Sequence, residues 1–97
     1  MKEREVVIHI RILHRDPTGR VSDGGVDFDL EQFAGQLPMI GDTIVDPGVL
    51  QGQDRRMPQN RQIWTVVGRV FNARDNEDYV ALIVENRDGN LADDAYL

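Results

Sequence analysis

The chain contains no cysteine. A disulfide framework, a thiolate metal site and a cysteine nucleophile are therefore excluded, and the fold must be held by packing alone. No apolar stretch approaches the roughly 18 consecutive residues that a membrane-spanning helix needs. The N-terminal MKEREVVIHIRIL has charges before its apolar run and no small-residue cleavage site after it, so we expect a cytoplasmic protein without a leader.

Positive charge is also scarce. Eleven Lys and Arg residues face 17 Asp and Glu residues, which gives a net charge of −6. Because Lys and Arg contacts to phosphates supply most nonspecific affinity for nucleic acids, the balance makes nucleic acid, and duplex DNA above all, an unlikely partner. With 40% apolar and 29% charged residues in 97, the sequence predicts one domain, residues 1–97, with a single modest core.

The first half of the chain alternates like β-strands. Residues 6–14 place three isoleucines on one face, and residues 26–33 alternate apolar with acidic side chains until Phe33 breaks the phase. We expect two strands joined by a mobile loop near 15–25. If they pair antiparallel, His9 and Arg11 lie opposite the acidic residues of the second strand, namely Asp27, Asp29 or Glu31.

The stretch LPMIGDTIVDPG, residues 37–48, reads as a corner. Pro38 and Gly41 suit a tight turn, a short strand follows at Thr43–Val45, and the DPG triplet ends it. We expect Leu37 and Ile40 to tuck beneath the sheet.

The second half is dominated by a predicted hairpin. Residues 48–62 are polar and aperiodic and predict a mobile loop, whereas 63–72 and 79–86 read as strands joined by a turn at 73–78. Gly68 within the first of these strands indicates a bulge. The acidic tail 87–97 is expected to fray, with a helical turn at 91–96 as the alternative.

Five strands and no convincing helix predict an all-β fold: a small, strongly bent antiparallel sheet or a partly open barrel. The patterns LPxxGDxI (37–44), WxVxxRxF (64–71) and ALIVE (81–85) cover about half the chain. In these motifs the chain resembles small SH3-like β-barrel proteins of bacteria and phages, many of which have no assigned function. The resemblance implies the barrel and transfers no catalytic residue.

No constellation for chemistry is evident. Ser22 and His14 lack a nucleophile motif, and His9 and His14, five residues apart on one strand, point to opposite faces. The acidic turn 75–78 lacks the glycine and the terminal glutamate of a calcium loop. We therefore predict no catalytic residue, no cofactor, no metal and no small-molecule substrate.

Two features are candidates for partner binding: the positively charged loop carrying Arg55, Arg56 and Arg61, and Trp64 directly after it. The leading hypothesis is a non-enzymatic binding or assembly module. It would self-associate as a homo-oligomer or dock another protein through the edge at Thr43–Val45 and the 48–62 loop. The alternative is a barrel that binds single-stranded nucleic acid through the arginine loop 55–61.

Overall fold

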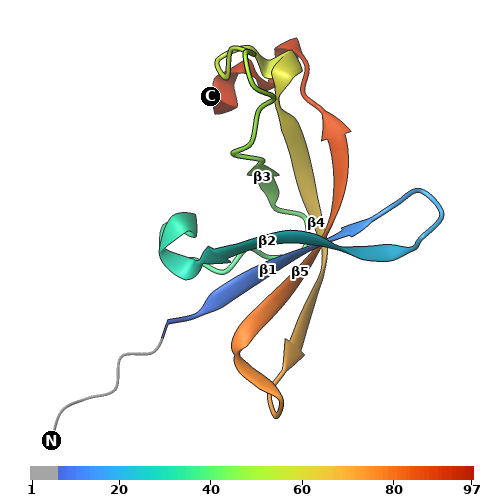
Figure 1. Cartoon of the computed structure of the whole chain (residues 1–97), viewed down its shortest axis with the longest axis vertical. Coiled ribbons are helices and arrows are strands. Elements are labelled where there is room, and N and C mark those ends of the chain that lie inside the picture. The colour runs from blue at the N-terminus through green and yellow to red at the C-terminus, as the bar shows by residue number, and fades with distance from the viewer. Residues whose placement is uncertain (1–6) are drawn as a thin grey trace, which may run out of the picture.

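The structure is a computed structural model that describes residues 7–97. Its five strands form one sheet in the order β2-β1-β5-β4-β3. The strands are β1 (His9–Arg15), β2 (Val21–Asp29), β3 (Thr43–Val45), β4 (Gln62–Asn72) and β5 (Asn76–Asp88), and three 3-10 helices are η1 (Leu30–Phe33), η2 (Pro58–Asn60) and η3 (Leu91–Tyr96). In Figure 1 the β1–β2 hairpin crosses the long β4–β5 hairpin. The predicted all-β fold of about five strands is confirmed.

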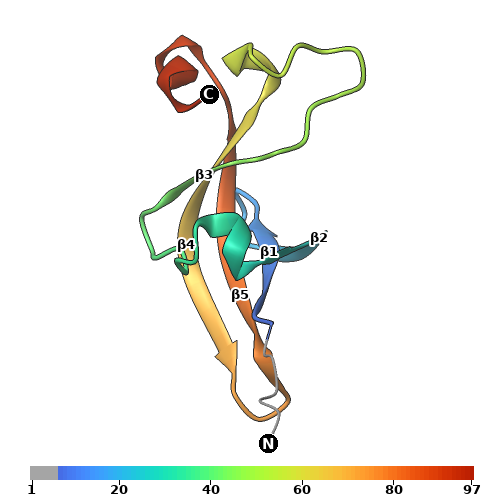
Figure 2. The same cartoon turned by 90° about the vertical axis from the view of Figure 1, so that its left-hand side faces the viewer.

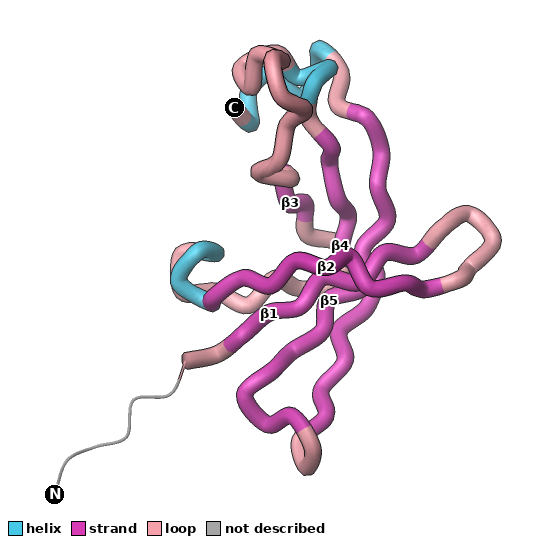
Figure 3. The backbone as a smooth tube through the Cα atoms, viewed as in Figure 1, coloured by secondary structure: helices cyan, strands magenta, loops and turns pink. Residues whose placement is uncertain are grey.

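The pairing of β1 differs from the prediction. It pairs antiparallel with β2 but parallel with β5, so the sheet is mixed rather than wholly antiparallel. A parallel pair needs a long crossover, and the chain between β1 and β5 supplies one by way of β2, β3 and β4. The sheet also does not close into a barrel, because β2 and β3 remain at opposite edges (Figure 3). Alternation in a sequence identifies the buried face of a strand, but not the edge along which it pairs.

The β1–β2 connection is much shorter than the loop expected near 15–25. Asp16 organises a tight turn: its Oδ1 accepts hydrogen bonds from the backbone N–H of Thr18 at 2.9 Å and of Arg20 at 3.0 Å. The Thr18 hydroxyl also donates to Oδ1, at 2.6 Å, and this hydrogen bond, with the one from the Arg20 N–H, holds the pKa of Asp16 below its ordinary value. Strand β2 therefore begins at Val21, five residues before the predicted start, and it ends at Asp29, where η1 takes over. The predicted start of the first strand at residue 6 lies outside the described residues.

The expected charge pairs across β1 and β2 are present. Arg11 Nε lies 3.3 Å from Asp27 Oδ1, and its Nη1 lies 3.5 Å from Asp23. The hydrogen bond to Asp27, with the negative charge of Asp23, raises the pKa of Arg11. His9 Nδ1 lies 3.5 Å from Asp29, whereas Glu31 belongs to η1 instead. These contacts match the register of the hairpin, in which Arg11 lies opposite Asp27 and His9 lies opposite Asp29.

One face of the sheet carries the core. Its buried members come from β1, β3, β4 and β5: Ile10, Ile12, Ile44, Trp64, Val66, Val80, Leu82 and Val84. Four half-buried residues in and near η1 pack against them: Phe28, Leu30, Phe33 and Leu37. Helix η1 lies over this face. A hydrogen bond caps its start, where Gln32 Oε1 accepts the Asp29 N–H at 2.9 Å. Ala34, with a φ of 57°, then reverses the chain. A single small cluster thus joins both hairpins.

The β4–β5 hairpin is longer than predicted, with only residues 73–75 in its turn. The register shifts between Val66 and Gly68, which confirms the bulge expected at Gly68. A Cβ on Gly68 would lie 3.3 Å from Ile83 Cδ1, so the close approach of the neighbouring strand favours glycine. No helix of the described chain is long and apolar enough to cross a membrane.

The corner at 37–48 is built as expected except for one side chain. Gly41, with a φ of 96°, turns the chain into β3, and β3 spans the predicted residues. Leu37 packs against the core, but Ile40 is 67% exposed, contrary to the expectation that it tucks beneath the sheet. The turn holds Ile40 outward because the adjacent Gly41 N–H and Asp42 C=O both bond to Val66.

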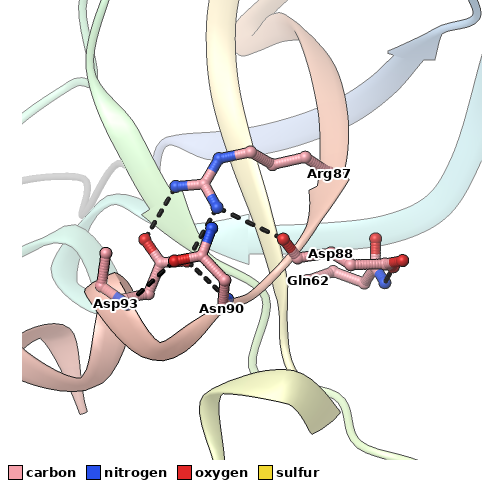
Figure 4. Close-up of polar contacts among 6 residues, drawn as sticks. Gln62, Arg87, Asp88, Asn90 and Asp93 are labelled. Atoms are coloured by element: carbon pink, nitrogen blue, oxygen red, sulfur yellow. Dashed lines mark hydrogen bonds and ion pairs between the residues drawn. The ribbon is translucent and has the colours of Figure 1, made fainter.

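The acidic tail is folded back rather than frayed. Arg87 makes a two-pronged contact with Asp93, at 2.7 and 2.8 Å, and the Asn90 N–H donates to the same carboxylate at 2.8 Å (Figure 4). Asp93 is buried, and Gly89 passes so close to Pro58 O that a Cβ would clash with it. A charge-paired, capped turn therefore replaces the fraying expected from composition.

The stability of this folded tail should depend on pH. The hydrogen bonds from Arg87 and Asn90 lower the pKa of Asp93 to about 2. A lowered pKa stabilises the fold above the ordinary pKa of about 3.9, and this contribution is lost as the pH falls through about 2. We expect the ¹³C carboxyl resonance of Asp93 to titrate near pH 2. We also expect the Ala92 amide to exchange faster in Asp93→Asn but not in Asp94→Asn, which removes the same charge. A titration midpoint near 4 would contradict the buried pair.

Candidate docking surface

Arg61, one of the predicted partner-binding residues, is turned inward. It is 8% exposed, and its guanidinium donates to the backbone C=O of Asp46 through Nε and Nη2, at 3.2 and 2.8 Å. Its Nη1 donates to the C=O of Arg55 at 3.0 Å. Arg61 therefore joins both ends of the 48–61 segment and orders it, which leaves its charge little access to a partner.

The other predicted site residues are divided between surface and core. Arg55 is exposed, yet its Nη2 donates to the Pro47 C=O at 2.8 Å. Arg56 is exposed, and its backbone N–H donates to Asp54 Oδ1 at 2.9 Å; within residues 7–97 its guanidinium makes no hydrogen bond or ion pair. Trp64 is 2% exposed and lies in the core, edge-on to His14 with ring centroids 5.4 Å apart. The structure does not bring these four side chains together as one surface.

His14 and Ser22 lie directly opposite each other in the β1–β2 register. His14 Nδ1 lies 2.6 Å from Asn86 Oδ1, and no hydrogen bond joins His14 to Ser22 among the described residues. Within residues 7–97 there is also no group of three or more His, Cys, Asp or Glu that could hold a metal ion. The arrangement around His14 is that of a half-buried side chain that supports the core.

Many apolar side chains remain outside the core. In the described part of the chain nine hydrophobic residues are buried, whereas fourteen large ones are exposed. Single exposed apolar residues are ordinary on protein surfaces, but two of these stand side by side at the corner that leads into β3: Met39, 60% exposed, and Ile40. Two neighbouring exposed apolar side chains therefore precede β3.

Strand β3 has an open edge. It pairs with β4 on one side and is the last strand of the sheet (Figure 2). On the β4 side, the Asp42 C=O accepts from Val66 N–H at 2.9 Å and the Asp46 N–H donates to Gln62 C=O at 3.0 Å. Because hydrogen-bonded residues alternate in an antiparallel ladder, Ile44 also faces β4, and the N–H and C=O groups of Thr43 and Val45 face away. Four backbone groups are therefore available for another strand.

A hollow of about 480 Å³ lies beside this edge. All three residues of β3 line it, together with apolar and amide side chains from η1 and the corner, including Phe33, Leu37, Met39, Gln32 and Gln36. Phe33 and Leu37 are half-buried members of the core's cover. Asp42 lines it as well, so the hollow is bordered by both apolar and polar side chains. It lies next to unpaired backbone groups, and pockets for side chains beside such groups are the combination used to bind extended peptides.

Sequence reasoning identified the edge at Thr43–Val45 but not the hollow. The sequence gives little indication of the hollow. Two of its lining residues, Phe33 and Leu37, are separated in sequence from β3 by the turn at Gly41. The phase break at Phe33 was the available hint, since it marks where the chain leaves the sheet and forms η1.

Comparisons with known proteins add no constraint. No protein-family model matches the chain, and it has no match among curated proteins or among solved structures.

Proposed function

We propose that this protein is a non-enzymatic docking module that takes up an extended segment of a protein partner along β3. The observation that carries the proposal is the open β3 edge, with the backbone groups of Thr43 and Val45 directed outward beside a hollow that Phe33 and Leu37 help to line. Strand addition of this kind derives affinity from main-chain hydrogen bonds and specificity from side-chain pockets.

The 48–62 loop has a supporting role in this proposal. Arg61 and Arg55 donate to backbone carbonyls of residues 46, 47 and 55, so they hold the segment that follows β3 in place. Arg61 is buried by these contacts and is withdrawn from the basic groove that the single-stranded nucleic-acid alternative requires, while the exposed Arg55 is tied to the Pro47 C=O. A net charge of −6 also opposes a phosphate backbone.

The edge can be blocked without disturbing the fold. Proline at position 43 lacks the outward N–H, and proline is tolerated on edge strands because that N–H is not used within the sheet. Thr43→Val is the matched control, since it keeps the N–H and the branched shape. We expect random twelve-residue peptides displayed on phage to yield binders of the wild-type chain and of Thr43→Val. These binders should lose at least tenfold in affinity for Thr43→Pro.

Far-UV circular dichroism and ¹⁵N–¹H correlation spectra establish that both variants remain folded. Peptides that bind Thr43→Pro as tightly as the wild-type chain, or spectra that shift only at residues remote from β3, would refute docking at this edge.

A further inference from the structure

We infer that the segment taken up along β3 is cationic at both ends of a five-residue stretch, with the pattern basic–x–apolar–x–basic. The inference rests on the proposed docking along β3 and adds the chemistry of the partner. It follows from which side chains of the strand share a face, and from the charges that flank β3.

The apolar centre follows from the hollow. Ile44 is buried and points to the core face of the sheet. Directly opposed residues on neighbouring strands share a face, so the partner residue opposite Ile44 also points to the core face, where Phe33 and Leu37 lie. An apolar side chain at this position would cover Phe33 and Leu37, whereas a charged one would lose hydration against them.

The basic flanks follow from Asp42 and Asp46. Both extend the ladder with β4 by one residue at each end of β3, through Asp42 C=O and Asp46 N–H. Each carboxylate uses one oxygen within the fold: Asp42 Oδ2 accepts the Met39 N–H and Asp46 Oδ1 accepts the Gly48 N–H, both at 2.8 Å. The other oxygen of each carboxylate has no hydrogen bond in the described part of the chain. Lys or Arg two residues to either side of the apolar centre would lie opposite them.

The same charges disfavour a second copy as the occupant. An antiparallel pair of β3 strands related by a two-fold axis at Ile44 would place Asp42 of one copy opposite Asp46 of the other at both ends. Like charges directly opposite each other destabilise a strand pair, and the net charge of −6 adds to the repulsion. A cationic segment of another protein is complementary in charge to Asp42 and Asp46, whereas a second copy of β3 is not.

The test uses three peptides with capped ends. Each is titrated into the full chain, and binding is followed by ¹⁵N–¹H correlation spectra. The first is Ser-Gly-Lys-Thr-Val-Thr-Lys-Gly-Ser, whose central five residues place lysine opposite both carboxylates. Because this sequence reads the same in both directions, the placement holds for either strand direction. The second carries glutamine and the third glutamate in place of the lysines. We expect the lysine peptide to shift Thr43 and Val45, to bind more tightly than the glutamine peptide, and to leave the glutamate peptide weakest.

Charge-removal variants assign the preference to β3. In Asp42→Asn with Asp46→Asn the amide oxygens keep both turn hydrogen bonds, and the advantage of lysine over glutamine should fall by roughly 1.5- to 5-fold for each carboxylate. The control, Asp75→Asn with Glu77→Gln, removes two charges from the far end of the β4–β5 hairpin and should leave the advantage unchanged.

Three results would overturn the inference. Equal binding of the lysine and glutamine peptides would remove the cationic preference while docking along β3 stands. No shift at Thr43 and Val45 with any of the three peptides would remove the site together with the proposed function. A dimer of the chain alone, detected by light scattering and lost in Thr43→Pro, would make a second copy the occupant.

Discussion

Replacing Trp64 by alanine should lower the free energy of unfolding by about 3–5 kcal/mol, the usual cost of removing a buried aromatic side chain from a core. Trp64 is 2% exposed and packs in a T-shaped arrangement with the rings of His14 and Phe28. A small domain has only about 5–15 kcal/mol in total, so this single substitution should remove a large share of the stability. Urea denaturation followed by circular dichroism measures the loss.

Two further variants separate a core role from a surface role for this tryptophan. Trp64→Phe should cost much less, because it keeps an aromatic ring and Trp64 Nε1 has no hydrogen-bond partner to lose in the described part of the chain. Phe71→Ala, at an exposed aromatic on the same strand, should cost about 1 kcal/mol or less. A Trp64→Ala chain as stable as the wild type would contradict its placement in the core.

Replacing Arg61 by alanine should lower the free energy of unfolding by about 1.5–3 kcal/mol, the range for hydrogen bonds that involve a charged group. The loss arises because the carbonyls of Asp46 and Arg55 lose their shared donor. Arg61→Lys should not restore the wild-type value, since an ammonium lacks the planar fork that reaches both carbonyls.

Arg56→Ala is the matched control for the loop. Its side chain is exposed, and its guanidinium makes no hydrogen bond or ion pair in the described part of the chain, so the free energy of unfolding should change by no more than about 0.5 kcal/mol. Equal effects of Arg56→Ala and Arg61→Ala would contradict the view that one arginine orders the segment while the other is free.

The contrast between these arginines shows a limit of sequence reasoning. Arg55, Arg56 and Arg61 look alike within a polar, aperiodic stretch. Whether an arginine turns inward depends on carbonyls that tertiary structure brings to it, and Asp46 is fifteen residues away from Arg61. The interpretation of the stretch as a cationic binding loop used charge, whereas the structure shows that the geometry of backbone acceptors decides the role of Arg61.

Strand β2 shows a second limit. Its VSDGG segment lacks the composition typical of a strand, because glycine and aspartate are depleted there, so residues 21–25 were expected in a loop. The structure gives a reason for the glycine: a Cβ on Gly24 would lie 2.6 Å from His14 Cδ2. The close packing of a histidine from the neighbouring strand therefore favours glycine in this strand.

Alternation and turn chemistry, by contrast, were sufficient for much of the fold. The isoleucines at 10 and 12 are fully buried as their period of two predicts, and β3 lies where the corner predicts it. The opposition of Arg11 to Asp27 also followed from pairing the two alternating segments. The parallel pairing of β1 with β5 did not follow, because it depends on the path of the whole chain between them.

Amide hydrogen exchange along β3 is the most direct test of the open edge. In the free chain Thr43 and Val45 should exchange fast, while Ile44, whose N–H faces β4, should exchange at least tenfold more slowly, at every protein concentration. Protection of Thr43 and Val45 in the free chain would mean that the edge is already covered. That result would contradict the proposal that β3 is available to a partner.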